Sequence, residues 1–271
     1  MDGLAKASIL DINGLTVPSG AVTPPLDTYT GAAAGYSVRL LRTAYPGSCM
    51  RVRVDGGNTE TDIGFDSNGD LDTAAIASHC GFNNGFIRYW YDQSGNANDA
   101  GQATAGTQPQ IYNGTAVITE NGKPCLKIVN DYFVLSPTLS LGSSMLTVVS
   151  CHKGQSFQET LTFDQRLYYR GSGGISLNAN STIVGSVTGI STQNLITAKF
   201  DSTTSVGRFN GTQFVSGTTG TTGTIQGIMS RGIGLQTTPN ATVQEMIQWP
   251  TWNTSNTAPM ENDIMTYFSI P

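Results

Sequence analysis

Charged side chains are scarce in this 271-residue chain. Lysine, arginine, aspartate and glutamate make up 12% of the residues, about half the share usual in a globular domain, and the formal net charge is −5. A nucleic-acid interface needs a dense stripe of lysine and arginine to neutralise phosphates, and the sequence contains no such stripe. We therefore expect no nucleic-acid partner.

Metal-binding patterns are lacking as well. The chain has only two histidines, His79 and His152, and its four cysteines form no C-x-x-C pair, so the common zinc sites are excluded. We expect no metal and no cofactor. Because no secretory signal is visible, the cysteines are expected to be buried thiols rather than disulfides. They are Cys49, Cys80, Cys125 and Cys151.

Long hydrophobic runs are also missing. The first residues show no apolar core of a signal peptide, and no stretch approaches the roughly 18–20 apolar residues of a membrane span. The sequence therefore predicts a protein without membrane insertion that is assembled in the cytoplasm of the cell that makes it.

Glycine is abundant, with 32 residues, and threonine, serine and asparagine are frequent, which suits short strands joined by tight turns. Residues 86–91 form the clearest strand, and Asn210-Gly211 between apolar runs predicts a hairpin turn. Many short strands indicate a sandwich or a barrel. Further strands are expected at residues 50–54, 116–119, 125–129, 146–151, 167–170, 182–187, 195–200, 206–209, 213–216 and 243–249.

Helices are expected in only a few places. Apolar residues at helical spacing predict one helix over residues 30–41. A second is expected over residues 73–80, with Asp72 as its N-cap and Gly81 ending it. A third, over residues 258–268, would close the chain.

The N-terminal segment, residues 1–24, reads as an extended arm. It contains several prolines, and its apolar residues are too few to build a core of their own. We expect it to serve as an anchor or assembly segment. Residues 25–271 show no break in composition, so they are expected to form one lectin-like domain.

The sequence WYDQSGN at residues 90–96 resembles a stretch of the catalytic domain of α-L-arabinofuranosidase B. A closer resemblance is to arabinofuranosidase-like domains of bacteriophage structural proteins, through residues 51–53, 62–66, 71–75 and 108–111. The second half is similar, more loosely, to laminin-G-like domains. What these resemblances imply is a mainly β, two-sheet jelly-roll sandwich of the concanavalin A type, with two or three short helices.

The same resemblance bears on catalysis. Retaining glycosidases need two carboxyl groups about 5–5.5 Å apart. The catalytic motifs of the arabinofuranosidase family lie in its C-terminal part, and they cannot be matched here. Beyond Arg170 the carboxylates are few, and none is marked as one of a pair: Asp201, Glu245, Glu261 and Asp263. We therefore expect no catalytic residue and a non-enzymatic protein.

Two polar segments suggest local roles. Asp92, Gln93, Ser94 and Asn96 follow the strong strand and are expected to hold a loop together through bonds to the backbone. In the acidic loop at residues 66–72, alternate side chains resemble calcium ligands, but the bidentate glutamate of an EF-hand is absent, so a turn and helix cap are favoured. The calcium alternative comprises Asp66, Asn68, Asp70 and Asp72.

Exposed aromatic rings stack on sugars, and four aromatic residues of the second half are candidates for such contacts. They are Trp249, Trp252, Tyr168 and Tyr169.

From the residues and the resemblance we predict a structural protein of a tailed-phage virion, such as a capsid decoration, fibre or tail component. It would contact other virion proteins through residues 1–24, form a homo-oligomer such as a trimer, and present its sandwich to host surface glycans. The alternatives are a glycan-binding adhesion module and an arabinofuranosidase-like glycoside hydrolase.

Overall fold

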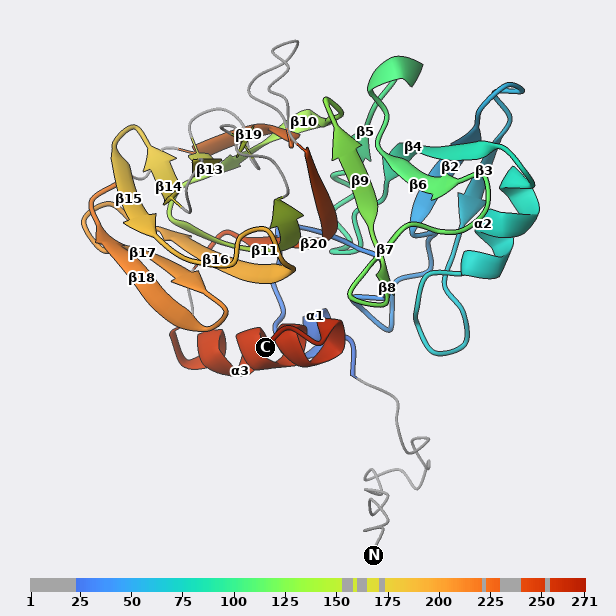
Figure 1. Cartoon of the computed structure of the whole chain (residues 1–271). Coiled ribbons are helices and arrows are strands. Elements are labelled where there is room, and N and C mark those ends of the chain that lie inside the picture. The colour runs from blue at the N-terminus through green and yellow to red at the C-terminus, as the bar shows by residue number, and fades with distance from the viewer. Residues whose placement is uncertain are drawn as a thin grey trace, which may run out of the picture.

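The computed structural model describes residues 23–152, 158–159, 165–170, 174–220, 223–229, 240–251 and 254–271 (Figure 1). Strands dominate this part of the chain, and antiparallel sheets form a β-sandwich, which confirms the predicted mainly β, jelly-roll class. Of the predicted N-terminal arm, only the last two residues are described.

Most strands belong to one sheet, whose path runs β18-β17-β16-β11-β20-β9-β6-β4-β5-β10-β19. Strand β1 pairs with β20, and β2 and β3 extend the sheet from β4. These strands are β1 (Ala34–Ser37), β2 (Met50–Val54), β3 (Glu60–Ile63), β4 (Asn84–Trp90), β5 (Ala100–Gly101), β6 (Gln110–Asn113), β9 (Leu126–Val129), β10 (Phe133–Leu141), β11 (Ser144–His152), β16 (Asn194–Phe200), β17 (Ser205–Phe209), β18 (Thr212–Gly217), β19 (Gly223–Ile228) and β20 (Asn240–Trp249).

Two smaller sheets complete the described strands. A four-stranded sheet has the order β12-β13-β14-β15, and β7 pairs with β8 in a hairpin. Figure 1 shows the four-stranded sheet on the same side of the molecule as β17 and β18, away from β2, β3 and β4. The strands are β7 (Thr119–Glu120), β8 (Lys123–Pro124), β12 (Gln158–Glu159), β13 (Gln165–Arg170), β14 (Gly174–Ala179) and β15 (Thr182–Ser186).

Strand β20 is central to the fold. It is hydrogen-bonded to β1, β9 and β11, and all of its residues except Asn240 are buried. Because both faces of this strand are covered, its polar residues are enclosed with the apolar ones. Gln244 and Glu245 are each 1% exposed and have hydrogen-bond partners inside the protein, whereas the side chain of Gln248, 3% exposed, has none among the described residues.

The helix predicted over residues 30–41 is wrong. Residues Ala34–Ser37 form β1, which pairs antiparallel with β20, and the helix in this region, α1, spans only Pro25–Thr28. All four residues of β1 are buried. A strand covered on both faces does not alternate apolar and polar residues, so its sequence can be mistaken for a helical pattern.

The other two helix predictions are confirmed. Helix α2 spans Thr73–Cys80; Asp72 accepts a hydrogen bond from the Ala75 amide at 2.9 Å, and Gly81 follows with a φ of 57°. Helix α3 spans Thr254–Phe268 and begins earlier than predicted, so Pro259 lies inside it rather than in its first turn. A short 3-10 helix, η1, spans Ala105–Thr107.

Helix α3 lies below the large sheet, beside α1 (Figure 1). It buries Met260, Ile264 and Phe268 on the side that faces the core. It therefore covers one face of the sheet with side chains that continue the apolar interior.

Two other local predictions, the hairpin turn and the state of the cysteines, are also confirmed. Asn210 and Gly211 both have positive φ, 45° and 75°, and form the turn between β17 and β18. All four cysteines are buried thiols. Within the described ranges, no helix is both long and apolar enough to cross a membrane.

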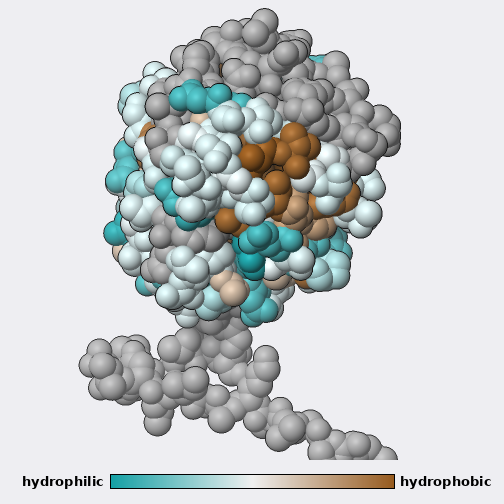
Figure 2. Space-filling model, turned by 90° about the vertical axis from the view of Figure 1, so that its left-hand side faces the viewer, coloured by the Kyte–Doolittle hydropathy of each residue, from teal (hydrophilic) through white to brown (hydrophobic). Residues whose placement is uncertain are grey.

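Figure 2 shows a hydrophobic patch on the side of the molecule that carries β15, β17 and β18. Apolar side chains of β15 and β18 are partly exposed in this region, and Val184 is 48% exposed. Phe214 is held there by close approach to glycines, since an added Cβ on Gly185 would stand 2.3 Å from its ring.

Candidate functional site

The loop after β4 is fixed by a buried carboxylate. Asp92 is 3% exposed and accepts hydrogen bonds from the amides of Gly35 and Ser94, both at 2.8 Å, and of Asn98 at 3.0 Å. The Ser94 hydroxyl also donates to it at 2.8 Å. With four donors around it, this carboxylate has no capacity left for a substrate.

The neighbouring polar residues make the same kind of contact. Gln93 is fully buried, donates to the carbonyls of Ser37 and Arg39, and accepts from the Leu41 amide at 2.8 Å. Asn96 donates to the Ala32 carbonyl at 2.9 Å. The loop thus ties the end of β4 to the segment around β1, which is the role that the sequence predicted for it.

Asp99 ends this loop and lines an open cavity of about 570 Å³, which we call the Asp99 cleft. Strands β4, β5 and β10 contribute to its walls, and the short pairing Leu135↔Ala100 and Val134↔Gly101 holds them together. Its lining residues are Arg88, Tyr89, Ala97, Asp99, Gly101, Gln102, Ala103, Thr104, Tyr132, Val134 and Ser136.

The Asp99 carboxyl is the acidic group in the lining of this cleft. Burial raises its pKa, and the nearby charge of Asp92 adds to that effect, although a hydrogen bond from the Asp92 amide at 2.9 Å opposes it. A carboxyl group with a raised pKa keeps its proton at higher pH than an exposed one. Asp99 can therefore act as a proton donor in a cleft that admits ligands.

The floor of the cleft is rigid. Gln102 is 3% exposed, donates to the Tyr132 carbonyl at 3.0 Å and accepts from the Thr104 amide at 2.9 Å. The Tyr89 ring lies over Gly101, where an added Cβ would come within 2.8 Å of it. These contacts hold Tyr89, Gln102 and Tyr132 in place, and all three residues still line the cleft.

A second carboxylate, Asp62, lies on the strand beside β2. It accepts two hydrogen bonds from Arg51, at 2.8 and 2.7 Å, and one from the Tyr91 hydroxyl at 2.7 Å. The hydrogen bond to Arg51 lowers the pKa of Asp62. Asp62 is 40% exposed, so it stays both ionised and accessible.

Asp62 and Asp99 share a neighbourhood. The pKa of Tyr91 is raised mainly by burial of its phenol and by its hydrogen bond to Asp62. The negative charges of Asp62 and Asp99 raise it further, so both carboxylates lie near this residue. The Tyr91 ring stacks with Tyr89 of the cleft at a centroid distance of 6.0 Å. This region therefore offers one carboxyl group with a raised pKa and one with a lowered pKa, the combination that acid–base chemistry uses.

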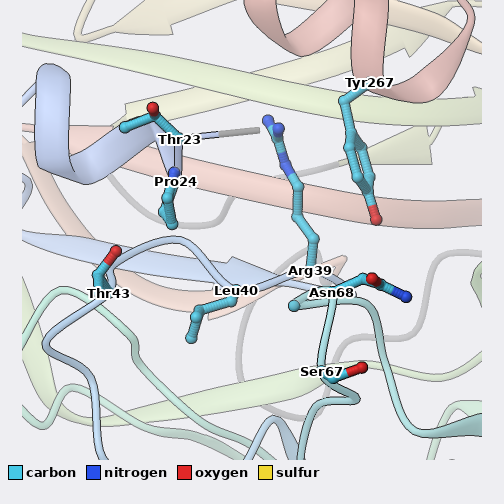
Figure 3. A pocket seen from close by; sticks show the side chains of 9 residues that line it. Thr23, Pro24, Arg39, Leu40, Thr43, Ser67, Asn68 and Tyr267 are labelled. Atoms are coloured by element: carbon cyan, nitrogen blue, oxygen red, sulfur yellow. The ribbon is translucent and has the colours of Figure 1, made fainter. Parts of the chain in front are cut away.

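A second cavity, of about 290 Å³, is lined by Arg39 and Tyr267, and we call it the Arg39 pocket (Figure 3). Arg39 is 3% exposed and forms a two-pronged ion pair with Glu245, at 2.7 and 3.1 Å. Its guanidinium lies 4.3 Å from the centroid of the Tyr267 ring, and Figure 3 shows the two side by side.

The Arg39 pocket has a structural explanation. Glu245 lies on β20 and Tyr267 on α3, so the pair and the ring contact join the helix to the centre of the sheet. The Tyr267 ring also contacts a second cation, since the Lys123 ammonium group lies 4.1 Å from its centroid. The Tyr267 hydroxyl donates a hydrogen bond to the Asp70 carboxylate. The charges of the cluster are matched internally, and no carboxylate lines the pocket itself.

The acidic loop uses its side chains on its own backbone. Asp66 accepts from the amides of Asn68 and Asp70 at 2.8 and 3.0 Å, and Asp72 caps α2. In the part of the chain that the structure describes, no group of three or more His, Cys, Asp or Glu side chains is placed to hold a metal ion. The side chains of Asp66 and Asp72 thus form the turn and the helix cap that the sequence favoured.

The predicted glycan-binding aromatics do not form a site. Trp249 is only 5% exposed and its indole N–H donates to the Tyr29 carbonyl at 3.2 Å, so the prediction that it presents a ring to sugars is corrected by its burial. Trp252 lies outside the described residues. Tyr168 and Tyr169 lie on β13, and their side chains are outside the described part.

Sequence reasoning missed Asp62, Asp99 and Arg88. Asp62 lies in the segment 62–66 and Asp99 lies just after the segment 90–96, both of which carry the family resemblance. That proximity was the only sign in the sequence that these two residues could matter. Their significance depends on burial, on hydrogen bonds and on a cleft built from β10, none of which the sequence displays.

Comparison with known proteins gives two findings. Residues 25–125 match the family model described as "Alpha-L-arabinofuranosidase B, catalytic". This range includes Asp62 and Asp99. The search of the curated proteins found no match.

Several solved structures share the fold. An arabinofuranosidase complexed with arabinofuranosyl-alpha-1,2-xylobiose superposes with a TM-score of 0.69 and 17% identity, over 89% of this chain and 64% of that one. A GH54 arabinofuranosidase soaked with a cyclic sulfate inhibitor gives 0.69 and 16% over the same shares. The binding domain of Paraclostridial Mosquitocidal Protein 1 gives 0.50 and 11%, over 65% of this chain and 50% of that one.

The chain thus spans 64% of the length of the arabinofuranosidases that it matches. The resemblance to arabinofuranosidase B in residues 25–125 and the sandwich fold are confirmed. The prediction of a non-enzymatic phage virion protein is wrong, because the matching family model describes the catalytic part of an enzyme and the solved structures that share the fold include arabinofuranosidases. Neither the structure nor the comparisons support the predicted role in a capsid, a tail fibre or any other part of a virion.

Proposed function

We propose that this chain is a glycoside hydrolase domain of the arabinofuranosidase type, which releases an arabinofuranosyl group from a glycan. The observation that carries the proposal is the match of residues 25–125 to a catalytic-domain family model, in a chain whose fold is that of the arabinofuranosidases. The Asp99 cleft supports it, because Arg88, Tyr89 and Asp99 of its lining lie within the matched range and Asp99 offers a carboxyl group to an open cavity.

In the proposed reaction, Asp99 donates its proton to the glycosidic oxygen as the bond from that oxygen to the anomeric carbon breaks. Asp62, held ionised by Arg51, forms a bond to the anomeric carbon as the leaving alcohol departs with the proton from Asp99. In the second step the Asp99 carboxylate takes a proton from a water molecule, whose oxygen bonds to the anomeric carbon while the bond to Asp62 breaks. The sugar leaves with its new hydroxyl group, Asp99 is protonated again and Asp62 is again a carboxylate.

The first test is hydrolysis of 4-nitrophenyl α-L-arabinofuranoside and of an arabinofuranosyl oligosaccharide by the purified chain. The expected result is release of arabinose from both. Asp62→Asn should lower kcat/KM by about 100-fold or more on both substrates, because it removes the carboxylate that bonds to the anomeric carbon. Asp99→Asn should affect the oligosaccharide far more, because nitrophenolate leaves without a proton.

Asp55→Asn is the matched control, because Asp55 is exposed on a turn and bonds only to the next amide. It should keep the activity of the unmodified chain. Failure of the unmodified chain to release arabinose from either substrate would contradict the proposal. Equal effects of Asp99→Asn and Asp55→Asn would remove Asp99 from the mechanism.

A second candidate function is glycan binding without cleavage. It is favoured by one observation, the combination of tyrosines, an anchored amide and hydroxyl groups in the Asp99 cleft, which suits the apolar and polar faces of a sugar ring. Binding of the oligosaccharide without release of arabinose would favour this candidate.

A further inference from the structure

Arg88 differs from the other arginines whose contacts the structure describes. Its guanidinium lies 4.5 Å from the centroid of the Tyr89 ring, and it makes no hydrogen bond or ion pair with the described residues. The other arginines with described contacts each have an oxygen partner: Arg39 has Glu245, Arg42 has Ser94, Arg51 has Asp62, Arg53 has Gln108 and Arg208 has Glu261.

The position of Arg88 is set by the surrounding strands. It lies on β4, its carbonyl accepts a hydrogen bond from the Gln102 amide at 2.9 Å, and the adjacent Tyr89 is packed on Gly101. Stacking on a fixed ring limits the guanidinium to few orientations. A guanidinium held in place loses less entropy on binding than a mobile one.

Arg88 lines the Asp99 cleft and forms no ion pair there with the described residues. The other charged residue in the lining is Asp99, which accepts a hydrogen bond from the Asp92 amide and none from Arg88. The remaining lining groups are neutral. The half-buried guanidinium therefore lines a cavity of about 570 Å³ with no acceptor among the described residues.

Such a cation points to an anionic group on the ligand. The planar guanidinium presents paired N–H donors that match both oxygens of a carboxylate, and this match is better than that of a lysine. The Asp99 cleft is large enough to hold more than the sugar at the reacting centre. A carboxylate on a neighbouring sugar ring would then be the ion-pair partner of the Arg88 guanidinium.

We propose that the Asp99 cleft recognises a glycan that carries a uronic-acid carboxylate, and that Arg88 binds this carboxylate. The inference names the substrate class for the cleft and rests on the proposed function in assigning the ligand as a glycan. It adds that the sugar beside the reacting centre is acidic.

The test is calorimetric binding of a methyl glucuronoside and of its uncharged methyl ester to the full chain. The acid should bind at least about 10-fold more tightly than the ester, the effect of one charge-assisted hydrogen-bonded contact. Arg88→Gln should abolish this preference. Arg88→Lys, which keeps the charge but not the paired donors, should retain only part of it.

Lys127→Gln is the matched control, because it removes a positive charge from an exposed position on β9 that does not line the cleft. It should leave the preference for the acid unchanged. Circular dichroism of each variant verifies the fold, and Arg88→Lys keeps the test decisive if Arg88→Gln does not fold.

Three results would overturn the inference: equal binding of acid and ester, a preference that survives in Arg88→Gln, or binding of inorganic sulfate as tight as that of the glucuronoside. The assay does not depend on turnover. A chain that prefers the acid but hydrolyses no arabinofuranoside would refute the proposed reaction and leave this inference standing. A chain that hydrolyses the neutral aryl arabinofuranoside without any preference for the acid would do the reverse.

Discussion

Asp92 and Asp99 are seven residues apart on one loop, and their surroundings give them different chemistry. Asp92 is enclosed and receives four hydrogen bonds, which occupy its oxygens. Asp99 receives one backbone hydrogen bond and faces a cavity, and burial raises its pKa. The first is therefore a structural residue and the second a candidate acid, although the sequence alone makes Asp92 the more conspicuous of the two.

At the same scale, the Arg39–Glu245 pair is expected to be essential for stability. Glu245→Ala leaves a fully enclosed guanidinium without its partner, which typically costs about 3–5 kcal/mol. Urea denaturation measures the loss, and Glu245→Gln, which keeps the volume and one acceptor, should lose less. Arg51→Ala breaks an exposed pair and should cost about 1 kcal/mol or less; a similar loss in both would contradict this prediction.

Asp131 is expected to make stability depend on pH. Burial raises its pKa to about 6, whereas an unfolded aspartate has a pKa of about 3.9. The folded state therefore holds the proton to higher pH than the unfolded state. As a result, the free energy of unfolding falls as pH rises from about 4 to about 6 and stays lower above that.

Asp131→Asn removes this dependence and keeps an acceptor for the Val129 amide, which now donates to Asp131 at 2.8 Å. The variant should be more stable than the unmodified chain by about 1 kcal/mol at pH 7, after allowing for solvent screening, and no more stable at pH 4. Urea denaturation at both pH values measures the difference. A gain of the same size at pH 4 would show that charge is not its cause.

At the scale of elements, helix α2 shows how one side chain fixes a boundary. Asp72 satisfies the Ala75 amide, which has no partner inside the helix, and its charge lies at the positive end of the helix dipole. Asp72→Ala should lower the free energy of unfolding by about 1 kcal/mol. Thermal denaturation measures it, with Glu60→Ala on an exposed edge of β3 as the control that should change little.

The elements also show where sequence patterns were sufficient. Helix α2, strand β2 at Met50–Val54 and the Asn210-Gly211 hairpin were predicted correctly because their signals are local: a cap, an alternation and a turn pair. Strand β1 was mistaken for a helix because its pairing with β20 joins segments about 210 residues apart. A local window contains no trace of such a partner.

At the scale of the whole molecule, the range matched by the catalytic family model is not an independent folding unit. Strand β1 pairs with β20, and β9, which follows this range, does the same. A chain limited to residues 25–125 would expose core side chains such as Trp90, which is fully buried here. The match to residues 25–125 therefore does not delimit a domain.

We accordingly expect a fragment of residues 25–125 to be unfolded, while the full chain is folded. Near-ultraviolet circular dichroism reports on the packing of Trp90 and should be lost in the fragment. Cooperative thermal unfolding of the fragment would contradict the prediction. Division of the chain into residues 1–24 and 25–271, and the homo-oligomer, stay predictions.

The sequence by itself determined the β class, the turn positions, the capped helix and the likeness of residues 25–125 to a catalytic domain, because composition, periodicity and motif are local properties. Only the tertiary structure decided which carboxyl group faces a cavity, which arginine lacks a partner and which tryptophan is buried. These properties depend on strands that are distant in sequence. The cleft that Asp99 and Arg88 line is formed where β5 and β10 pair beside β4.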